Sequence, residues 1–230
     1  MIIQFTNTLD VDIEQPIPAS KVLPDWYKKL DSYIGNEKDA YNSVLKGNRG
    51  TAKKCMPLFD AITSGYLITS VSDVHIKQVD GQPYYPWSTL EQIEFHPTEQ
   101  LPVHPQNKTH EIAIPKWNNY WSIKTPKGYS CLIVNPMHRD LPFTIFPGVV
   151  DTDSYYAPIR FPFTLNDLGY EGLIPAGTPI AQIIPFKRNN WEMEIGSNEN
   201  LKQIKSINHK INTKFFDSYK TQFRQVKDYR

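Results

Sequence analysis

The alternation of apolar and polar residues marks a central region of strands with helical patterns on both sides. From Tyr66 the pattern has a period of two, and short apolar runs then alternate with Pro, Gly and Asn to about residue 195. Short strands at regular spacing are typical of a β-sandwich or barrel, and the chain lacks the helical crossovers that a parallel α/β fold needs. The sequence therefore predicts a mainly β domain over residues 66–195.

Helical patterns come before and after this domain. Residues 23–34 place apolar side chains on one helical face, with Pro24 in the first turn, which predicts a short helix. A second helix is predicted from about Thr51 to Ser64, with Gly65 as its stop; Pro57 must be absorbed within it or break it into two pieces. Residues 1–65 are therefore expected to form an N-terminal arm and helices that pack on the β domain.

The C-terminal region, residues 196–230, carries the clearest helical pattern. Seven apolar residues fall at spacings of three and four with lysines between them: Leu201, Ile204, Ile207, Ile211, Phe215, Tyr219 and Phe223. The pattern predicts one long amphipathic helix whose apolar stripe is covered. With the other two regions it is expected to form one compact unit.

Composition excludes several classes of protein. Apolar residues make up 40% of the chain, which excludes a disordered protein, and no window reaches the ~18 apolar residues of a membrane span. The sequence from Met1 shows neither a basic leader nor an apolar core, so secretion through a signal peptide is not expected. Cys55 and Cys131 sit among apolar neighbours and are expected to be buried free thiols.

Charge is distributed unevenly along the chain. The formal net charge is only +1, but residues 201–230 carry eight basic and two acidic side chains. A basic helix beside a mildly acidic body can dock within the chain, dock on a neighbouring subunit or bind nucleic acid. Docking is favoured, because the helix also has its apolar stripe.

Two segments carry specific motifs. Residues 146–159 contain Gly148-Val-Val-Asp-Thr-Asp153, and residues 174–184 contain Gly177-Thr-Pro-Ile-Ala-Gln182. The turn residues Gly148 and Gly177 predict hairpins at 146–160 and 174–186. These motifs resemble those of the trimeric dUTPase and dCTP deaminase superfamily, over about residues 120–187. The resemblance implies a β-clip or distorted barrel and sites built between subunits.

The resemblance also assigns roles to single residues. Asp151 takes the position of the family's carboxylate, which orients the attacking water and holds the 3′-hydroxyl, so it is the candidate catalytic residue. The sugar-stacking aromatic would fall at Ser154, and Tyr155 replaces it only through a one-residue bulge. The phosphate-binding Arg-Ser dipeptide, the metal-linked aspartate and the Gly-rich closing arm have no match. The candidate ligand-binding residues are Asp153, Tyr155, Gln182, Arg139 and His138.

Other interpretations of these residues are structural. Asp151 and Asp153 also suit turn chemistry, because aspartate side chains accept hydrogen bonds from backbone amides. Arg139 could clamp an anion or pair with Asp140. His96, His104 and His110 are irregularly spaced in a proline-rich loop, which favours solvent-facing side chains over a metal site, and no metal ligand is predicted.

The leading hypothesis is a non-catalytic viral protein on a dUTPase-like β scaffold, an oligomeric structural or binding module. Residues 54–66, 125–130 and 148–153 also resemble a family common in tailed bacteriophages, which implies a viral origin and brings no activity. The alternatives are a diverged nucleoside-triphosphate pyrophosphatase using Asp151 and a nucleic-acid-binding accessory protein using the basic helix. No cofactor is expected, with Mg²⁺ only if the enzyme alternative holds. The expected partners are further copies of the chain, with a trimer favoured, and other viral proteins, but no membrane; the expected location is the host cytoplasm or the virion.

Overall fold

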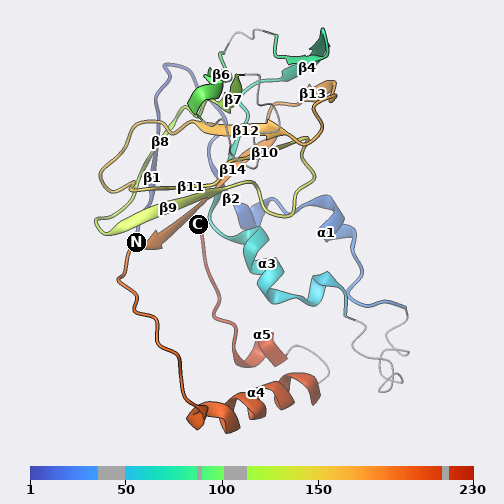
Figure 1. Cartoon of the computed structure of the whole chain (residues 1–230), viewed down its shortest axis with the longest axis vertical. Coiled ribbons are helices and arrows are strands. Elements are labelled where there is room, and N and C mark those ends of the chain that lie inside the picture. Colours follow the sequence, from blue (N-terminus) through green and yellow to red (C-terminus); the bar gives the residue numbers. More distant parts are fainter. Residues whose placement is uncertain (36–49, 87–89, 101–112, 214–217) are drawn as a thin grey trace. The chain divides into compact units, whose positions relative to one another are not determined.

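The computed structural model describes residues 1–35, 50–86, 90–100, 113–213 and 218–230 (Figure 1). It divides into two compact units. The β unit consists of Met1–Val22 with Gly65–Arg188, and the helical unit of Leu23–Ser64 with Asn189–Arg230. In the part of the chain that the structure describes, no helix is long and apolar enough to cross a membrane.

The β unit consists of short antiparallel strands joined by turns, which confirms the mainly β fold predicted from the sequence. Its strands are β1 (Gln4–Asn7), β2 (Ile17–Pro18), β3 (Tyr66–Thr69), β4 (Val74–Val79), β5 (Gln82–Tyr84), β6 (Ile93–His96), β7 (Ile114–Trp117), β8 (Trp121–Lys124), β9 (Tyr129–Val134), β10 (Phe143–Ile145), β11 (Gly148–Val150), β12 (Phe161–Leu165), β13 (Gly172–Ile174) and β14 (Pro179–Lys187). Single 3-10 turns lie at η1 (Ala19–Lys21) and η3 (Thr98–Gln100).

These strands form four sheets, and the largest has the order β11-β9-β14-β3-β2. The others are β10-β12-β7-β6, β13-β4-β5 and the pair β1-β8. The long strand β14 lies between β9 and β3, with Ile183 opposite both Ile133 and Tyr66. Because side chains alternate across a strand, Cys131, Ile133 and Ile183 all point into the core.

An aromatic cluster fills the middle of this core. The Trp117 and Phe163 rings stack with centroids 5.0 Å apart, and Phe143 lies 5.6 Å from Phe163. All three side chains are fully buried. They come from β7, β12 and β10, so the cluster joins three adjacent strands of the four-stranded sheet.

The two hairpins predicted from the turn residues are wrong. Strand β11 pairs with β9, and the residues after it form a turn before β12 pairs with β10 and β7. Likewise β13 pairs with β4, while β14 pairs with β3 and β9. Gly177 does make the expected turn, with φ +80°, but the strands on its two sides belong to different sheets. The turn residues thus located the turns correctly, but the strands on either side of each turn do not pair with each other.

The helical unit contains α1 (Asp25–Lys29), η2 (Ala52–Lys54), α3 (Met56–Thr63), η4 (Asn198–Asn200), α4 (Leu201–Thr213) and α5 (Ser218–Gln222). Pro24 takes the N-cap position of α1, just before the first turn in which the sequence placed it, and the helix is shorter than the predicted 23–34. Pro57 lies in the first turn of α3 and separates it from η2, so the predicted second helix is broken into two pieces. The C-terminal helix is confirmed, but it is divided between α4 and α5, with residues 214–217 outside the described part of the chain.

Burial in this unit differs from one expectation made from the sequence, that for Cys55. Leu201, Ile204 and Ile211 on the α4 stripe are 41%, 51% and 41% exposed in the single chain, so the helical unit by itself does not cover them, and cover by another subunit stays a prediction. Cys55 is exposed because it precedes α3 at its open end; Cys131 is buried, and both thiols are free.

Asp60 joins α3 to the C-terminal segment. Its carboxylate accepts hydrogen bonds from Arg224 Nε at 3.0 Å, Arg224 Nη2 at 2.6 Å and Lys227 Nζ at 2.7 Å. The Arg224 guanidinium also lies 5.4 Å from the Phe59 ring centroid. The hydrogen bond from Arg224, opposed by burial and aided by Lys227, lowers the pKa of Asp60. Two of the eight basic side chains of the C-terminal region are therefore engaged by one buried carboxylate.

Candidate functional site

The predicted site residues lie near opposite ends of strand β9. Asp151 and Asp153 follow β11, whose last residue Val150 pairs with Cys131 near the start of β9. Gln182 instead pairs with Val134, at the end of β9. Ser130 and Val134 are four positions apart along the strand, or about 13 Å at ~3.3 Å per residue. A single chain therefore does not gather Asp151 with Gln182.

At the start of β9, Arg188 binds both aspartates of the first group, Asp151 and Asp153. Its Nη1 donates to Asp151 Oδ1 at 3.0 Å and to Asp153 Oδ1 at 2.9 Å, and its Nη2 donates to Asp153 Oδ2. Ser130 Oγ donates to Asp151 Oδ1 at 2.7 Å, and the Gly128 amide donates to Asp153 Oδ2 at 2.8 Å. We call these residues the Arg188 cluster. It ties the turn after β11 to the end of β14 through a bidentate guanidinium–carboxylate pair.

The two carboxylates differ in exposure and in what they can do. The Asp153 side chain is 7% exposed and fully engaged, and the hydrogen bonds from Arg188 and Gly128 lower its pKa from 3.8 to about 2. A carboxylate with so low a pKa is a weak proton acceptor at neutral pH. The Asp151 side chain is 63% exposed and accepts only through Oδ1 among the described residues. Asp151 alone keeps a carboxylate oxygen for a ligand.

Replacing Arg188 by glutamine is expected to raise the pKa of Asp153 back toward 3.8, because the first cause of its depression is removed. The depressed pKa means that this pair stabilises the fold above pH ~4 and loses its effect as the pH falls through about 2. Carbon-detected NMR titration of the Asp153 carboxyl measures the change. Lys187→Gln, at the neighbouring exposed strand end, is the control and should leave that titration unchanged. An Asp153 pKa near 2 in the Arg188→Gln protein would contradict the assignment.

Tyr155 does not take the place of the missing stacking aromatic through a bulge. Its backbone N–H donates to Asp151 O at 2.9 Å, and Ser154 Oγ donates to the same carbonyl at 3.2 Å, so both residues close a turn. The Tyr155 side chain is 51% exposed. Beside it, Lys124 Nζ lies 4.9 Å from the Tyr156 ring centroid.

The second group of predicted site residues, Gln182, His138 and Arg139, lies around the loop after β9. Gln182 is buried, and its Oε1 accepts from the Met137 amide at 2.9 Å, which fixes the loop to β14. The next residue, His138, is exposed and has a left-handed backbone with φ 56°. Arg139 Nη2 donates to the Val22 carbonyl, and its buried Nε finds no hydrogen-bond partner in the part of the chain that the structure describes. Burial lowers the pKa of Arg139, and among the described residues it makes no ion pair with Asp140.

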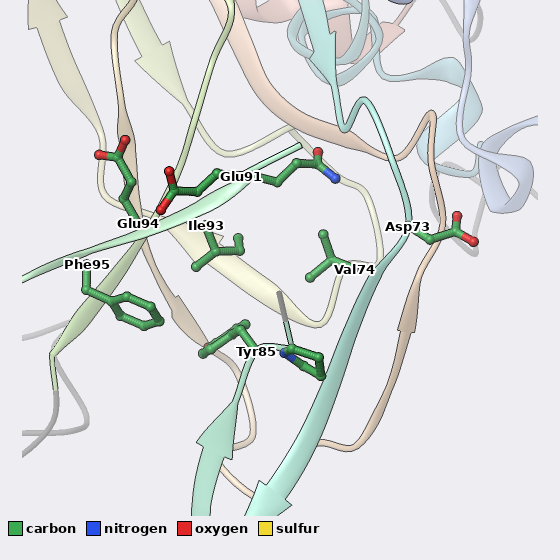
Figure 2. Close-up of a pocket in the computed structure, with 9 residues that line it drawn as sticks. Asp73, Val74, Tyr85, Glu91, Ile93, Glu94 and Phe95 are labelled. Carbon is green, nitrogen blue, oxygen red and sulfur yellow. The ribbon is translucent and has the colours of Figure 1, made fainter. Parts of the chain in front are cut away.

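A pocket of about 310 Å³ lies elsewhere in the β unit, between the start of β4 and strand β6 (Figure 2). Val74, Tyr85, Ile93 and Phe95 form its apolar side, and Tyr85 lies edge-on to Phe95 with centroids 5.8 Å apart. None of the residues predicted to form a site lines it. Its only sequence signal is the alternation of Ile93 and Phe95 with polar neighbours, which any half-buried strand shares.

Acidic side chains border the same pocket. Glu94 pairs with Lys116 at 3.0 Å and with Arg160 at 3.5 Å. Burial acts to raise the pKa of Glu94, but the hydrogen bonds from Lys116 and Asn118 and the charge of Arg160 outweigh it and lower that pKa. Asp73 points away from the apolar side in Figure 2, and its Oδ1 accepts from the Ala176 amide at 2.8 Å. Two of the bordering carboxylates thus have structural partners.

Metal ligands do not assemble within the described ranges: no three His, Cys, Asp or Glu side chains there lie together as a metal site. His96 is at the end of β6, whereas His104 and His110 lie outside the described residues. The prediction that these three histidines face solvent therefore stays a prediction.

Comparison with known proteins finds similarity to solved structures alone. No family model and no curated protein matches the sequence. Among solved structures, the chain is similar to the dUTPase of phage phi11 of S. aureus, with 11% identity over 87% of this chain and 99% of that chain and a TM-score of 0.38. It is also similar to the dUTPase of Staphylococcus bacteriophage 80alpha, with 13% identity over 86% and 96% of the two chains and a TM-score of 0.33. At these values the likeness carries nothing about the site, whose function depends on its own residues.

Proposed function

We propose that this chain is a non-catalytic, homo-oligomeric module of viral origin. It would bind a partner or form part of a structure and would not hydrolyse a nucleotide. It would act in the virion or as an accessory protein in the host cytoplasm. A closed ring, with three copies favoured, is the assembly that the sequence resemblance implies. Fold alone does not decide function, so the proposal depends on the state of the candidate site.

The observation that carries the proposal is the Arg188 cluster. A general base needs a free lone pair and a pKa near the working pH. Asp153 is poorly suited on both counts, since Arg188 and Gly128 donate to its two oxygens and lower its pKa to about 2. Asp151 shares the same guanidinium at 3.0 Å. The carboxylates of the dUTPase-like motif thus serve as links between the turn and β14.

The second group of residues supports the same proposal. Arg139 is directed to the Val22 carbonyl and Gln182 to the Met137 amide, so both make internal contacts. Gln182 is completely buried, which leaves its side chain no surface for a ligand. These residues hold the loop after β9 in place.

We expect the purified protein to release no pyrophosphate from dUTP or dCTP above background. Losing one positioned electrostatic group commonly costs about 2.7–4 kcal/mol of transition-state stabilisation, and several of the superfamily's groups are unmatched here. A coupled pyrophosphate assay with and without Mg²⁺ measures the release, with an active dUTPase as positive control. Robust release that Asp151→Asn abolishes and Asp167→Asn preserves would move the chain into the enzyme class. Asp167 is a turn residue outside the cluster and serves as the matched control.

One observation favours the enzyme alternative and is the reason to run that assay. The Asp151 side chain is 63% exposed, with one oxygen unused by the described residues. If subunits meet at this surface, that oxygen could face a ligand shared between them. The nucleic-acid alternative depends on the exposed lysines of α4, and salt-dependent binding of a DNA duplex would support it.

A further inference from the structure

The pocket beside β6 has an apolar middle and an acidic edge, and none of its described lining residues is basic. Its volume of about 310 Å³ falls within the range of about 300–1,000 Å³ that is usual for small-molecule sites. Figure 2 shows the carboxylates of Glu91 and Glu94 at one edge and the apolar side chains at the middle. The pocket therefore suits a ligand with an apolar body and a charged end.

Gln92 fixes the two walls of this pocket to each other. Gln92 is 2% exposed, and its side-chain Oε1 accepts from the Val71 amide at 2.9 Å. Its Nε2 donates to the Ser72 carbonyl at 2.6 Å, and its own carbonyl accepts from the Asn118 amide at 2.8 Å. Breaking these buried hydrogen bonds would be costly, so the pocket is formed before any ligand arrives.

The acidic edge carries negative charge that the described part of the chain does not neutralise. Glu94 has two basic partners, whereas neither Glu91 nor Asp73 makes an ion pair with a described residue. Burial raises the pKa of the Tyr120 hydroxyl, and the charges of Glu91 and Glu94 contribute to the rise, which places both carboxylates near that hydroxyl. The field of this edge favours a cation and repels a phosphate group.

Tyr85 and Phe95 give the middle of the pocket an aromatic surface. Their ring centroids are 5.8 Å apart, and the ring planes are inclined by 64°. Phe95 is 47% exposed, so part of its ring is available to a ligand. A third ring can pack against such a pair edge-on or offset, and it would cover the exposed part of Phe95.

We propose that this pocket binds an arylalkylamine, a small organic cation whose ammonium group is joined to an aromatic ring by a short chain. The ring would pack on Tyr85 and Phe95, and the ammonium would donate to the Glu91 carboxylate. A charge-assisted hydrogen bond of this kind selects the amine over a neutral or anionic ligand of the same shape. The inference deepens the proposed function, because it names the ligand class that the binding module takes.

The first experiment titrates the full chain with three ligands that share a phenyl ring: phenethylammonium, phenylethanol and phenylpropionate. Phenethylammonium should bind with a dissociation constant of about 1 mM or tighter, and at least about fivefold more tightly than phenylethanol. Phenylpropionate should bind more weakly than either. Calorimetry measures the affinities, and amide NMR shifts should centre on residues 91–95. Equal affinities for the amine and the alcohol would overturn the inference.

The second experiment assigns the two ends of the ligand to residues. Glu91→Gln should reduce phenethylammonium binding to the level of phenylethanol and leave phenylethanol binding unchanged. Glu99→Gln, in η3 and outside the pocket, changes the net charge equally and should alter neither affinity. Phe95→Ala should weaken both ligands by a similar factor, whereas Leu173→Ala, an exposed apolar residue outside the pocket, should not. Far-ultraviolet circular dichroism checks that the variants stay folded.

A third arm separates a free amine from a lysine side chain of a partner protein, which carries the same ammonium group. Acetyl-lysine methylamide has the charge without the aromatic ring, so it should bind at least about fivefold more weakly than phenethylammonium. If it binds more tightly, the pocket does not select an aromatic body, and the inference is overturned in favour of a protein lysine.

The outcomes also separate this inference from the proposed function. Phenethylammonium that binds no better to the wild type than to Glu91→Gln would overturn the amine site and leave the non-catalytic module standing. Robust pyrophosphate release from dUTP that Asp151→Asn abolishes would overturn the proposed function, and the amine titration would still decide the pocket.

Discussion

Replacing Phe163 by alanine is expected to lower the free energy of unfolding of the β unit by about 3–5 kcal/mol, the usual cost of emptying a buried aromatic site. Phe163 is completely buried and contacts Trp117, Phe143 and Tyr85, with ring centroids 5.0, 5.6 and 6.2 Å away. Trp117 and Phe143 lie on strands β7 and β10, and Tyr85 directly follows β5, so these neighbours cannot collapse together into the space. Urea denaturation followed by far-ultraviolet circular dichroism measures the change.

The control for this variant is Val79→Ala in β4. Val79 is 51% exposed, so its truncation should change the free energy of unfolding by no more than about 0.5 kcal/mol. If Phe163→Ala proves as mild as Val79→Ala, the aromatic cluster is not the centre of the core. The comparison also tests the register that brings β7, β10 and β12 together.

The parts of the fold that depend on neighbouring residues could be predicted from the sequence. The period-two pattern from Tyr66 gave β3, and the prolines placed α1 and the break before α3. Gly65 ends the helical pattern because its φ is +70° and a Cβ there would meet the Ile183 carbonyl oxygen at 2.0 Å. Each of these signals acts within a few residues.

Strand partners and the state of the candidate site could not be predicted in this way. β11 pairs with β9 rather than across its own turn, because sheet pairing is decided by which strands bury their apolar faces together. Arg188 suggested only a strand-end charge, since it lies 37 and 35 residues from the aspartates that it binds. The register of β14 against β9 brings it there, and that register is not visible in the sequence.

The two aspartates of the motif lie where the resemblance implied, but their contacts could not be read from the sequence. Asp151 and Asp153 follow a strand end, as the resemblance implied, but Arg188 makes them part of the scaffold.

Replacing Asp60 by alanine is expected to destabilise the helical unit by about 3 kcal/mol or more, because removing one partner of a buried ion pair leaves the other charge uncompensated. The Asp60 and Arg224 side chains are 11% and 13% exposed, and the carboxylate accepts from both Arg224 and Lys227. Without it, the guanidinium would have to leave the Phe59 ring for water. Hydrogen exchange followed by mass spectrometry should show faster exchange in 56–63 and 218–228.

The matched control replaces the acidic partner of an exposed pair in the same segment. Asp228 binds Arg230 at 2.7 Å, but the two side chains are 56% and 88% exposed, so Asp228→Ala should cost no more than about 1 kcal/mol. The lowered pKa of Asp60 adds a pH test: the stability that it provides is present above its unfolded pKa of about 3.8 and is lost as the pH falls through the lower folded value. The Asp60→Ala protein should therefore lose less stability than the wild type on acidification. If exchange in 218–228 is unchanged by Asp60→Ala, another contact holds the C-terminal segment, and Arg224 and Lys227 are available to bind an acidic partner.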